Sequence, residues 1–221
     1  MRLRHKPNAI PEMKENDFIY FDGDVNKGKW REIFGNNNPI HLEIGAGMGD
    51  FIIQKAMDNP DINYIALEMN TNAFVVCSRK ILDKELTNIR GIIANAENIE
   101  DIFAKDEIDK IYLNFSTPWP KKRHNKRRLS HQRFLDRYVN IIKDNAEIEL
   151  KTDNEDFFDA SIDYFTEYGM EINEVDRNLD IKKSVVTEYE NKFRNKNMPI
   201  YFVKATFKEG DNKWKRLEKQ L

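Results

Sequence analysis

Hydrophobic and polar positions along the chain fall into two alternating patterns. Short runs rich in Ile, Leu, Val and Tyr are typical of buried strands, and longer runs with apolar residues three or four positions apart are typical of helices. The strand-like runs cover residues 40–44, 63–67, 89–94, 110–115, 147–151, 170–175 and 200–207. The helix-like runs cover residues 29–34, 50–59, 73–86, 99–103, 131–142 and 155–168.

This alternation predicts an α/β fold with a seven-stranded, mostly parallel sheet and helices on both faces. No clear helix separates the last two strands, so one of them is expected to run antiparallel. Residues 1–28 show neither pattern and are predicted to form an irregular N-terminal arm, whose mobility stays open. Residues 208–221 form a basic C-terminal tail. We expect a single domain over residues 1–221.

Composition limits the class of protein. The chain has 221 residues, of which 40% are hydrophobic and 33% charged, as in a soluble globular protein. Its net charge of −2 does not predict nucleic-acid binding, so only a segregated charge distribution could support it. A single cysteine suits a reducing cytoplasm. No apolar run approaches the length of a membrane-spanning helix, and the basic start lacks the apolar segment of a secretory signal.

Three glycines follow the first predicted central strand. Gly45, Gly47 and Gly49 stand at its carboxyl end, where open α/β sheets bind ligands. A dinucleotide fingerprint would place its third glycine at position 50, which is Asp50. Glu43 adds a carboxylate that would repel a pyrophosphate and attract a cation. The loop therefore favours a positively charged ligand.

A second acid, Glu68, ends the next strand, 19 residues after Gly49. Such a carboxylate can accept hydrogen bonds from both ribose hydroxyls of a nucleoside. A nucleoside that also carries a positive charge is S-adenosylmethionine. Asn95, at the end of the third strand, could contact the adenine or only cap the following helix. The alternative is a tight turn with two surface acids.

The strand at residues 110–115 leads into Pro118-Trp119-Pro120 and then into six Lys or Arg residues within positions 121–128. This run provides the segregated charge that the totals do not show. Arg123, Arg127 and Arg128 have the side chain best suited to fork onto phosphates. Trp119 could stack on a base or only brace the turn. The alternative for the whole run is a solvated face.

Several motifs resemble the bacterial tRNA (guanine-N7)-methyltransferase family over nearly the whole chain. They are residues 43–49, 114–116 with 118–124, 126–129, 151–154, and 187–190 with 192–193. The resemblance implies a Rossmann-like class I methyltransferase fold, S-adenosylmethionine as methyl donor without a metal, and tRNA as partner. The implied acceptor is N7 of guanosine 46, in tRNA numbering, in the variable loop. Whether the protein is a monomer or a homodimer stays open.

The resemblance also assigns site residues. The donor-binding positions are Glu43, Gly45, Gly47, Glu68, Asn95 and Thr117. The substrate-binding positions are Lys121, Arg123, Asp153, Thr187, Glu188, Tyr189 and Glu190. Two positions depart from the family, because Asn95 and Thr117 each replace an Asp. The Asp at position 117 is usually given the catalytic role.

The chemistry decides how serious the change at Thr117 is. Guanine N7 carries a lone pair and no proton, so methyl transfer needs orientation rather than a base. A lost electrostatic contact of this kind costs roughly 3 to 4 kcal/mol. We expect Thr117 to position the base by its hydroxyl, and Asp153 or Glu190 to supply the missing charge. Two alternatives remain, a tRNA-binding protein with weak or lost catalysis, and a methyltransferase for another base or a small molecule.

Overall fold

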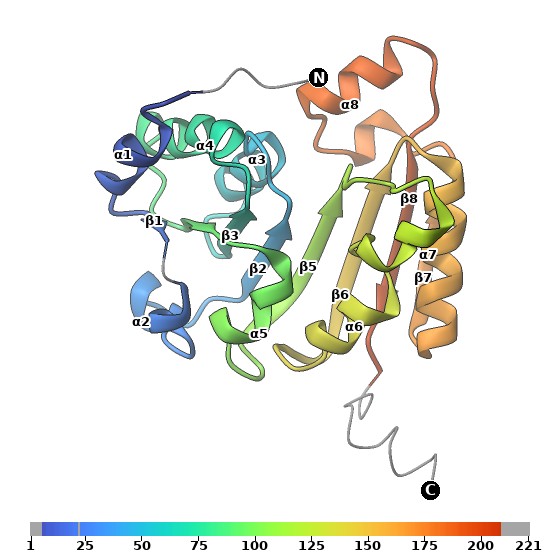
Figure 1. The fold of residues 1–221 in the computed structure, drawn as a ribbon, viewed down its shortest axis with the longest axis horizontal. Helices are drawn as coiled ribbons and strands as arrows, with labels where there is room; N and C mark the ends of the chain where they lie inside the picture. Colours follow the sequence, from blue (N-terminus) through green and yellow to red (C-terminus); the bar gives the residue numbers. More distant parts are fainter. Residues whose placement is uncertain (1–5, 22, 209–221) are drawn as a thin grey trace, which may run out of the picture.

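The structure, a computed structural model that describes residues 6–21 and 23–208, is built on an eight-stranded β-sheet (Figure 1). The strands are β1 (Ile19–Tyr20), β2 (Ile40–Ile44), β3 (Asn63–Glu68), β4 (Ile89–Ile93), β5 (Ile108–Asn114), β6 (Ile142–Thr152), β7 (Glu171–Asp176) and β8 (Tyr201–Thr206). The α-helices are α1 (Ala9–Lys14), α2 (Trp30–Phe34), α3 (Asp50–Asp58), α4 (Thr71–Asp83), α5 (Ile99–Ile102), α6 (Gln132–Tyr138), α7 (Glu155–Tyr168) and α8 (Glu188–Arg194). Short 3-10 helices are η1 (Gly23–Asn26), η2 (Ala96–Asn98), η3 (Lys122–Arg127) and η4 (Ile181–Lys183).

The strand order across the sheet is β1-β4-β3-β2-β5-β6-β8-β7. The strands from β1 to β6 pair in parallel, whereas β8 runs antiparallel to both β6 and β7. The order reverses between β2 and β5, and open α/β sheets bind ligands at the carboxyl ends of the strands beside such a point. The predicted class of fold and the antiparallel strand are confirmed.

Each face of the sheet has its own hydrophobic core. On one face, Phe51, Phe74 and Val75 from α3 and α4 pack with Met13 of α1. On the other face, α5, α6 and α7 bury Ile99, Phe134, Leu135, Phe157, Phe158 and Phe165 against the strands. The strand runs are apolar at nearly every position because both faces of the central strands are covered.

The N-terminal segment differs from the prediction. Its described part forms α1, which packs on α4, and β1, which pairs with β4 and makes an eighth strand. Ala9, Met13 and Ile19 are buried there, and Glu12 pairs with Arg79 of α4 at 2.5 Å. The prediction of an irregular arm was therefore wrong for this part, because burial of a few apolar residues outweighs the weak local pattern. The basic tail from residue 209 on lies outside the described residues.

Two other element boundaries differ from the prediction. The predicted helix at residues 131–142 ends at Tyr138, and the strand expected at 147 already begins at Ile142. The segment between β7 and β8 also contains α8, which the pattern did not predict. Among the residues that the structure describes, no helix combines the length and apolar character needed to cross a membrane.

Candidate active site

The glycine loop connects β2 to α3 at the carboxyl edge of the sheet. Gly45 and Gly47 have φ of 84° and 56°, which L-residues with a Cβ rarely adopt. A Cβ at either position would meet no atom within 4 Å, so the backbone faces open space. Gly49 differs, because a Cβ there would lie 2.3 Å from the Sγ of Cys77 in α4. Two glycines thus leave room for a ligand, and the third allows close packing.

Glu68 at the end of β3 is fixed by backbone donors. Its Oε2 accepts a hydrogen bond from the Gly47 N–H at 3.0 Å. Its Oε1 accepts from the Met69 and Asn70 N–H groups at 2.9 and 2.7 Å. The carboxylate therefore joins the glycine loop to the next strand end. A carboxylate can accept further bonds from a ligand, because each oxygen has two lone pairs.

Glu43 lies beneath the loop and is buried. Asn114 Nδ2 of β5 donates to its Oε1 at 2.9 Å, whereas its Oε2 is buried without a hydrogen-bond partner. Burial raises the Glu43 pKa to about 8, against the opposing effects of the Asn114 hydrogen bond and the Lys151 charge. A polar oxygen buried without a partner is costly, and a cationic ligand beside it would favour the ionised form of Glu43.

Asn95 follows β4 and is exposed. Its Oδ1 accepts a hydrogen bond from the Glu97 N–H at 3.0 Å and caps η2. The capping alternative is therefore present in the structure, at the strand end where an adenine contact was expected.

The stretch after β5 makes a strained turn. Phe115 and Trp119 have positive φ of 48° and 45°, which costs energy in a non-glycine residue. Arg128 is buried and donates from Nε to the Pro118 carbonyl at 2.8 Å. Its guanidinium also lies 5.6 Å from the Phe157 ring centroid. Arg128 therefore braces the turn, and the prediction that it is a phosphate fork was wrong.

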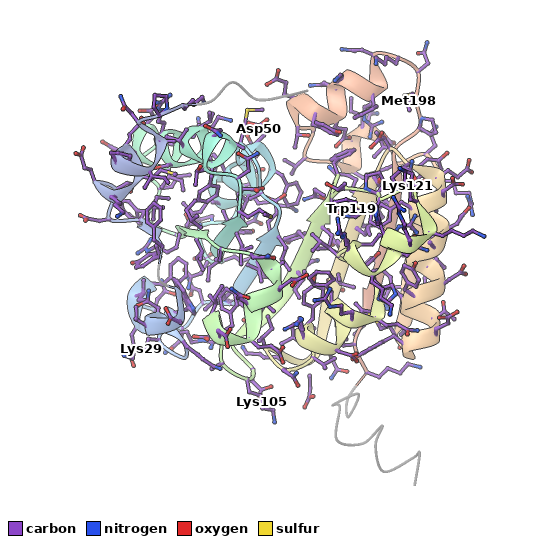
Figure 2. All side chains as sticks on the ribbon, viewed as in Figure 1. Lys29, Asp50, Lys105, Trp119, Lys121 and Met198 are labelled. Atoms are coloured by element: carbon purple, nitrogen blue, oxygen red, sulfur yellow. The ribbon has the colours of Figure 1, made fainter. Side chains whose placement is uncertain are left out.

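The remaining basic residues are presented to solvent. Lys121, Lys122, Arg123, Lys126 and Arg127 are all exposed, mostly on η3. The Arg127 guanidinium lies 5.0 Å from the Trp119 ring centroid, and the His124 ring meets Trp119 edge to face. Figure 2 shows Trp119 and Lys121 close together near the end of β5. Trp119 thus packs against η3, and the exposed cations form one basic surface.

Thr117 lies between the end of β5 and the basic surface. It is exposed, two residues after Phe115, at the junction of the strand end and the basic surface. Asp153 follows β6 and is half-buried, and burial raises its pKa. Because β5 and β6 pair in parallel up to Asn114 and Lys151, Thr117 and Asp153 follow neighbouring strand ends.

The segment before β8 brings the last predicted residues to this edge. Thr187 caps α8, and its Oγ1 accepts from the Glu190 N–H at 3.0 Å. Glu188 is exposed, and Tyr189 is half-exposed with its ring centroid 5.3 Å from that of Phe115. Burial, with the charge of Asp153 second, raises the Tyr189 pKa. Tyr189 therefore lies close to Asp153 and to the end of β5.

Glu190 is instead fully buried. Its Oε2 accepts from Lys151 Nζ at 2.6 Å and from Ser184 Oγ at 2.9 Å, and its Oε1 accepts from Arg194 Nε at 2.7 Å. The sequence patterns did not predict the contacts of Lys151 with Glu190 and of Asn114 with Glu43. Lys151 and Asn114 both stand at strand ends within motifs of the family, and that position was the available signal.

Comparisons with known proteins agree with this geometry. The family model Methyltransf_4, described as "Putative methyltransferase", matches residues 37–203. A solved 16S rRNA methyltransferase, KamB, has a TM-score of 0.65 at 14% identity and covers 82% of this chain and 93% of its own. A 16S rRNA (adenine(1408)-N(1))-methyltransferase with cosubstrate SAM from Catenulisporales acidiphilia has a TM-score of 0.62 at 11% identity, covering 86% and 93%. These structures confirm the methyltransferase fold.

Curated relatives are much more similar in sequence. The tRNA (guanine-N(7)-)-methyltransferase of Bacillus cytotoxicus is 44% identical, covering 94% of this chain and 98% of its own. The enzymes of the same name from Oceanobacillus iheyensis and Clostridium tetani are 45% and 44% identical, covering 95% and 94% of this chain and 100% of their own. With matches of this identity along nearly its whole length, the chain belongs to the tRNA (guanine-N(7)-)-methyltransferase family.

Proposed function

We propose that the protein transfers a methyl group from S-adenosylmethionine to N7 of a guanosine in tRNA, at variable-loop position 46 in tRNA numbering. The observation that carries this proposal is the similarity to curated enzymes of that name over nearly the full chain. The site supports it, because a cradle for a cationic nucleoside and a basic surface lie at the same edge of the sheet.

The donor side fits S-adenosylmethionine by its own geometry. The open space over Gly45 and Gly47 lets a ligand approach the backbone closely. The unpaired Oε2 of Glu43 offers a partner to a positive charge, and Glu68 stands where a ribose diol would be bound. Asn95 is assigned to the adenine side. When bound, the donor supplies an electrophilic methyl group on sulfur.

The acceptor side orients the base. Guanine N7 needs no deprotonation, so the protein gains rate by positioning N7 and by stabilising the positive charge that reaches the ring. We assign the positioning to the Thr117 hydroxyl and the charge stabilisation to Asp153. Glu190 is less suited to that charge role, because its carboxylate is fully buried and already bonded to Lys151 and Arg194.

The exposed cations bind the tRNA backbone. Lys121 and Arg123 are assigned to phosphates, and the exposed Glu188 and Tyr189 face the substrate from the other side, on a helix that the buried Thr187 caps. Because the net charge of the chain is −2, this local surface, rather than the total charge, provides the attraction.

We further propose that residues 1–221 act as one methyltransferase domain in the cytoplasm, as a monomer or a homodimer. The single cysteine supports a reducing compartment. The alternative of lost catalysis through Thr117 and Asn95 gains no support from the relatives, which carry the name of the active enzyme.

A methylation assay tests the proposal. The protein is incubated with an unmodified tRNA transcript and S-adenosylmethionine, and the modified nucleoside is identified and mapped. We expect 7-methylguanosine in the variable loop, and donor binding by calorimetry without tRNA. A methyl group on another base would refute the assigned acceptor. Donor binding without methylation of any tRNA would favour the alternative of a tRNA-binding protein with weak or lost catalysis.

A further inference from the structure

We propose that Lys151 is a positioning residue for the methyl transfer, because it fastens the substrate-side segment (residues 179–194) against the end of β5. Through this contact the half-exposed Tyr189 forms one wall of the acceptor site beside Phe115. The inference rests on the proposed function, and it assigns to Lys151 a role that neither the motif nor its burial shows alone.

Lys151 cannot act on the substrate directly. Its side chain is 5% exposed, and its ammonium has three hydrogen-bond acceptors. Nζ donates to Glu190 Oε2 at 2.6 Å, to Ser184 Oγ at 2.8 Å and to the Val185 carbonyl at 3.0 Å. An ammonium has only three hydrogens to donate, so these bonds use all of them. All three acceptors belong to the substrate-side segment.

The same network closes the segment onto itself. The second oxygen of Glu190 accepts from Arg194 Nε, and Arg194 Nη2 donates to the Leu179 carbonyl at 2.9 Å. The Arg194 guanidinium therefore joins the two ends of the segment, and Glu190 links this guanidinium to Lys151. The exposed pair between Lys183 and Glu174, at 3.7 Å, is a weaker link to β7.

Lys151 also fixes the other half of the wall. Its main-chain carbonyl accepts from the Phe115 N–H at 2.7 Å, and its ammonium lies 5.6 Å from the Phe115 ring centroid. The rings of Phe115 and Phe193 are nearly parallel, 6.4 Å apart, and Tyr189 packs on both. One residue thus sets the position of the strand end and of the segment that faces it.

The wall suits an exposed purine. Tyr189 is 50% exposed and follows the buried cap Thr187, so its ring is held from one side and open on the other. Aromatic rings of this kind bind unstacked RNA bases by stacking. The charge of Lys151 also lowers the pKa of Glu43 against its burial, which adds a smaller effect on the donor side.

Two variants separate positioning from general stability. Lys151→Met removes the three bonds, and the double variant Lys151→Met with Glu190→Gln avoids leaving the buried Glu190 carboxylate with one cationic partner fewer. The matched control is Lys110→Met, on the neighbouring strand. Lys110 has an exposed fraction of 16% and pairs with Glu147 at 2.7 Å and Glu149 at 2.6 Å, away from the segment.

Amide hydrogen exchange of the full-length protein and steady-state methylation of a tRNA transcript give the readouts. Both Lys151 variants are expected to speed exchange in residues 184–190 by about tenfold or more, with the glycine loop at 45–49 unchanged. Their kcat/KM for tRNA should fall by about a hundredfold, while donor affinity changes by less than about tenfold. Lys110→Met should stay within about threefold in every measurement.

A second pair of variants tests the wall itself. Tyr189→Ala should lose nearly as much activity as Lys151→Met, and Tyr189→Phe, which keeps a ring that can stack, should lose less activity than Tyr189→Ala. The loss from Lys151→Met combined with Tyr189→Ala should be well below the product of the two single losses, since both act through one ring.

Three results would overturn the inference. They are unchanged exchange in residues 184–190 in the Lys151 variants, activity of Lys151→Met within threefold of the parent, and an equal loss in Lys110→Met. If the parent protein methylates no tRNA, the proposed function fails, whereas the exchange experiment still decides whether Lys151 fastens the segment.

Discussion

The two sides of the site are held by different kinds of bonds. On the donor side, the Gly45 and Ala46 N–H groups bond to the Leu67 carbonyl, and the Gly47 N–H bonds to Glu68, all within the ends of two paired strands. On the acceptor side, long-range side chains do the holding, with Arg128 on the turn after β5 and Lys151 on the segment before β8.

This difference has a consequence for function. The donor loop is held mainly by bonds between two adjacent strand ends, so it depends less on long-range side chains than the acceptor side does. On the acceptor side, a single substitution at Lys151 removes three of the bonds that hold the segment. The following predictions test the contrast, beginning with the largest expected effect.

The first prediction concerns Glu43, which is buried with one oxygen unpaired. Because its pKa is raised to about 8, the folded protein binds a proton more tightly than the unfolded chain, and stability falls as pH rises from about 4.5 to 8. Glu43→Gln removes this loss. The free energy of unfolding of Glu43→Gln minus that of the parent should therefore increase by roughly 3 to 5 kcal/mol as the pH rises through this window.

Denaturant unfolding at a series of pH values gives this difference. A difference that stays flat between pH 4 and 8 would show that Glu43 ionises as an ordinary carboxylate, and that the donor side stores no such unfavourable charge.

The second prediction uses two glycines with similar backbones. Gly47→Val should weaken S-adenosylmethionine binding by about a hundredfold, because a branched side chain strains a φ of 56° and fills the space left for the ligand. Gly35→Val is the matched control, since Gly35 has a φ of 72°, faces equally open space and caps α2. Calorimetry should show that Gly35→Val changes the affinity for S-adenosylmethionine by less than about threefold.

The third prediction tests the basic surface. Lys121→Ala with Arg123→Ala should make the slope of log affinity for tRNA against log salt shallower by about 1.5, as two phosphate contacts are lost. The control pair, Lys29→Ala with Lys105→Ala, removes two exposed lysines at the lower edge of the molecule, far from Lys121 (Figure 2). Equal slopes for both double variants would exclude a localised footprint.

The fourth prediction has the smallest expected effect. Thr117→Asp should change the single-turnover rate of methylation by less than about tenfold, because we propose that Asp153 at the neighbouring strand end supplies the negative charge. In a protein that carries Asp153→Asn, the same Thr117→Asp substitution should change this rate by a larger factor. A Thr117→Asp variant hundreds of times faster than the parent would show that nothing compensates for the missing carboxylate.

The contrast between the two sides also explains what could be predicted from the sequence. The glycine loop and Glu68 follow from short-range spacing, because a strand end, a turn and a helix start are adjacent in the chain. The role of Lys151 depends on partners 33 to 39 residues away. No local pattern reports such a contact, and only the match to a family motif pointed to that position.

The errors in the fold have the same origin. Helix α1 and strand β1 are short and have weak local propensity, and they form because Met13 and Ile19 find partners on α4 and β4. Arg128 looked like its exposed neighbours because a run of identical charges does not show which member turns inward. In each case tertiary packing decided what local sequence left open.

The close contact between Gly49 and Cys77 provides a natural probe. Burial raises the pKa of this thiol, which suppresses the reactive thiolate, and Cys77 is the only cysteine of the chain. A thiol-specific alkylating reagent can therefore attack Cys77 only when the packing around it opens, and the glycine loop is part of that packing. The rate of alkylation should measure how often this packing opens, and any ligand that locks the loop should slow it, with no label introduced by mutation.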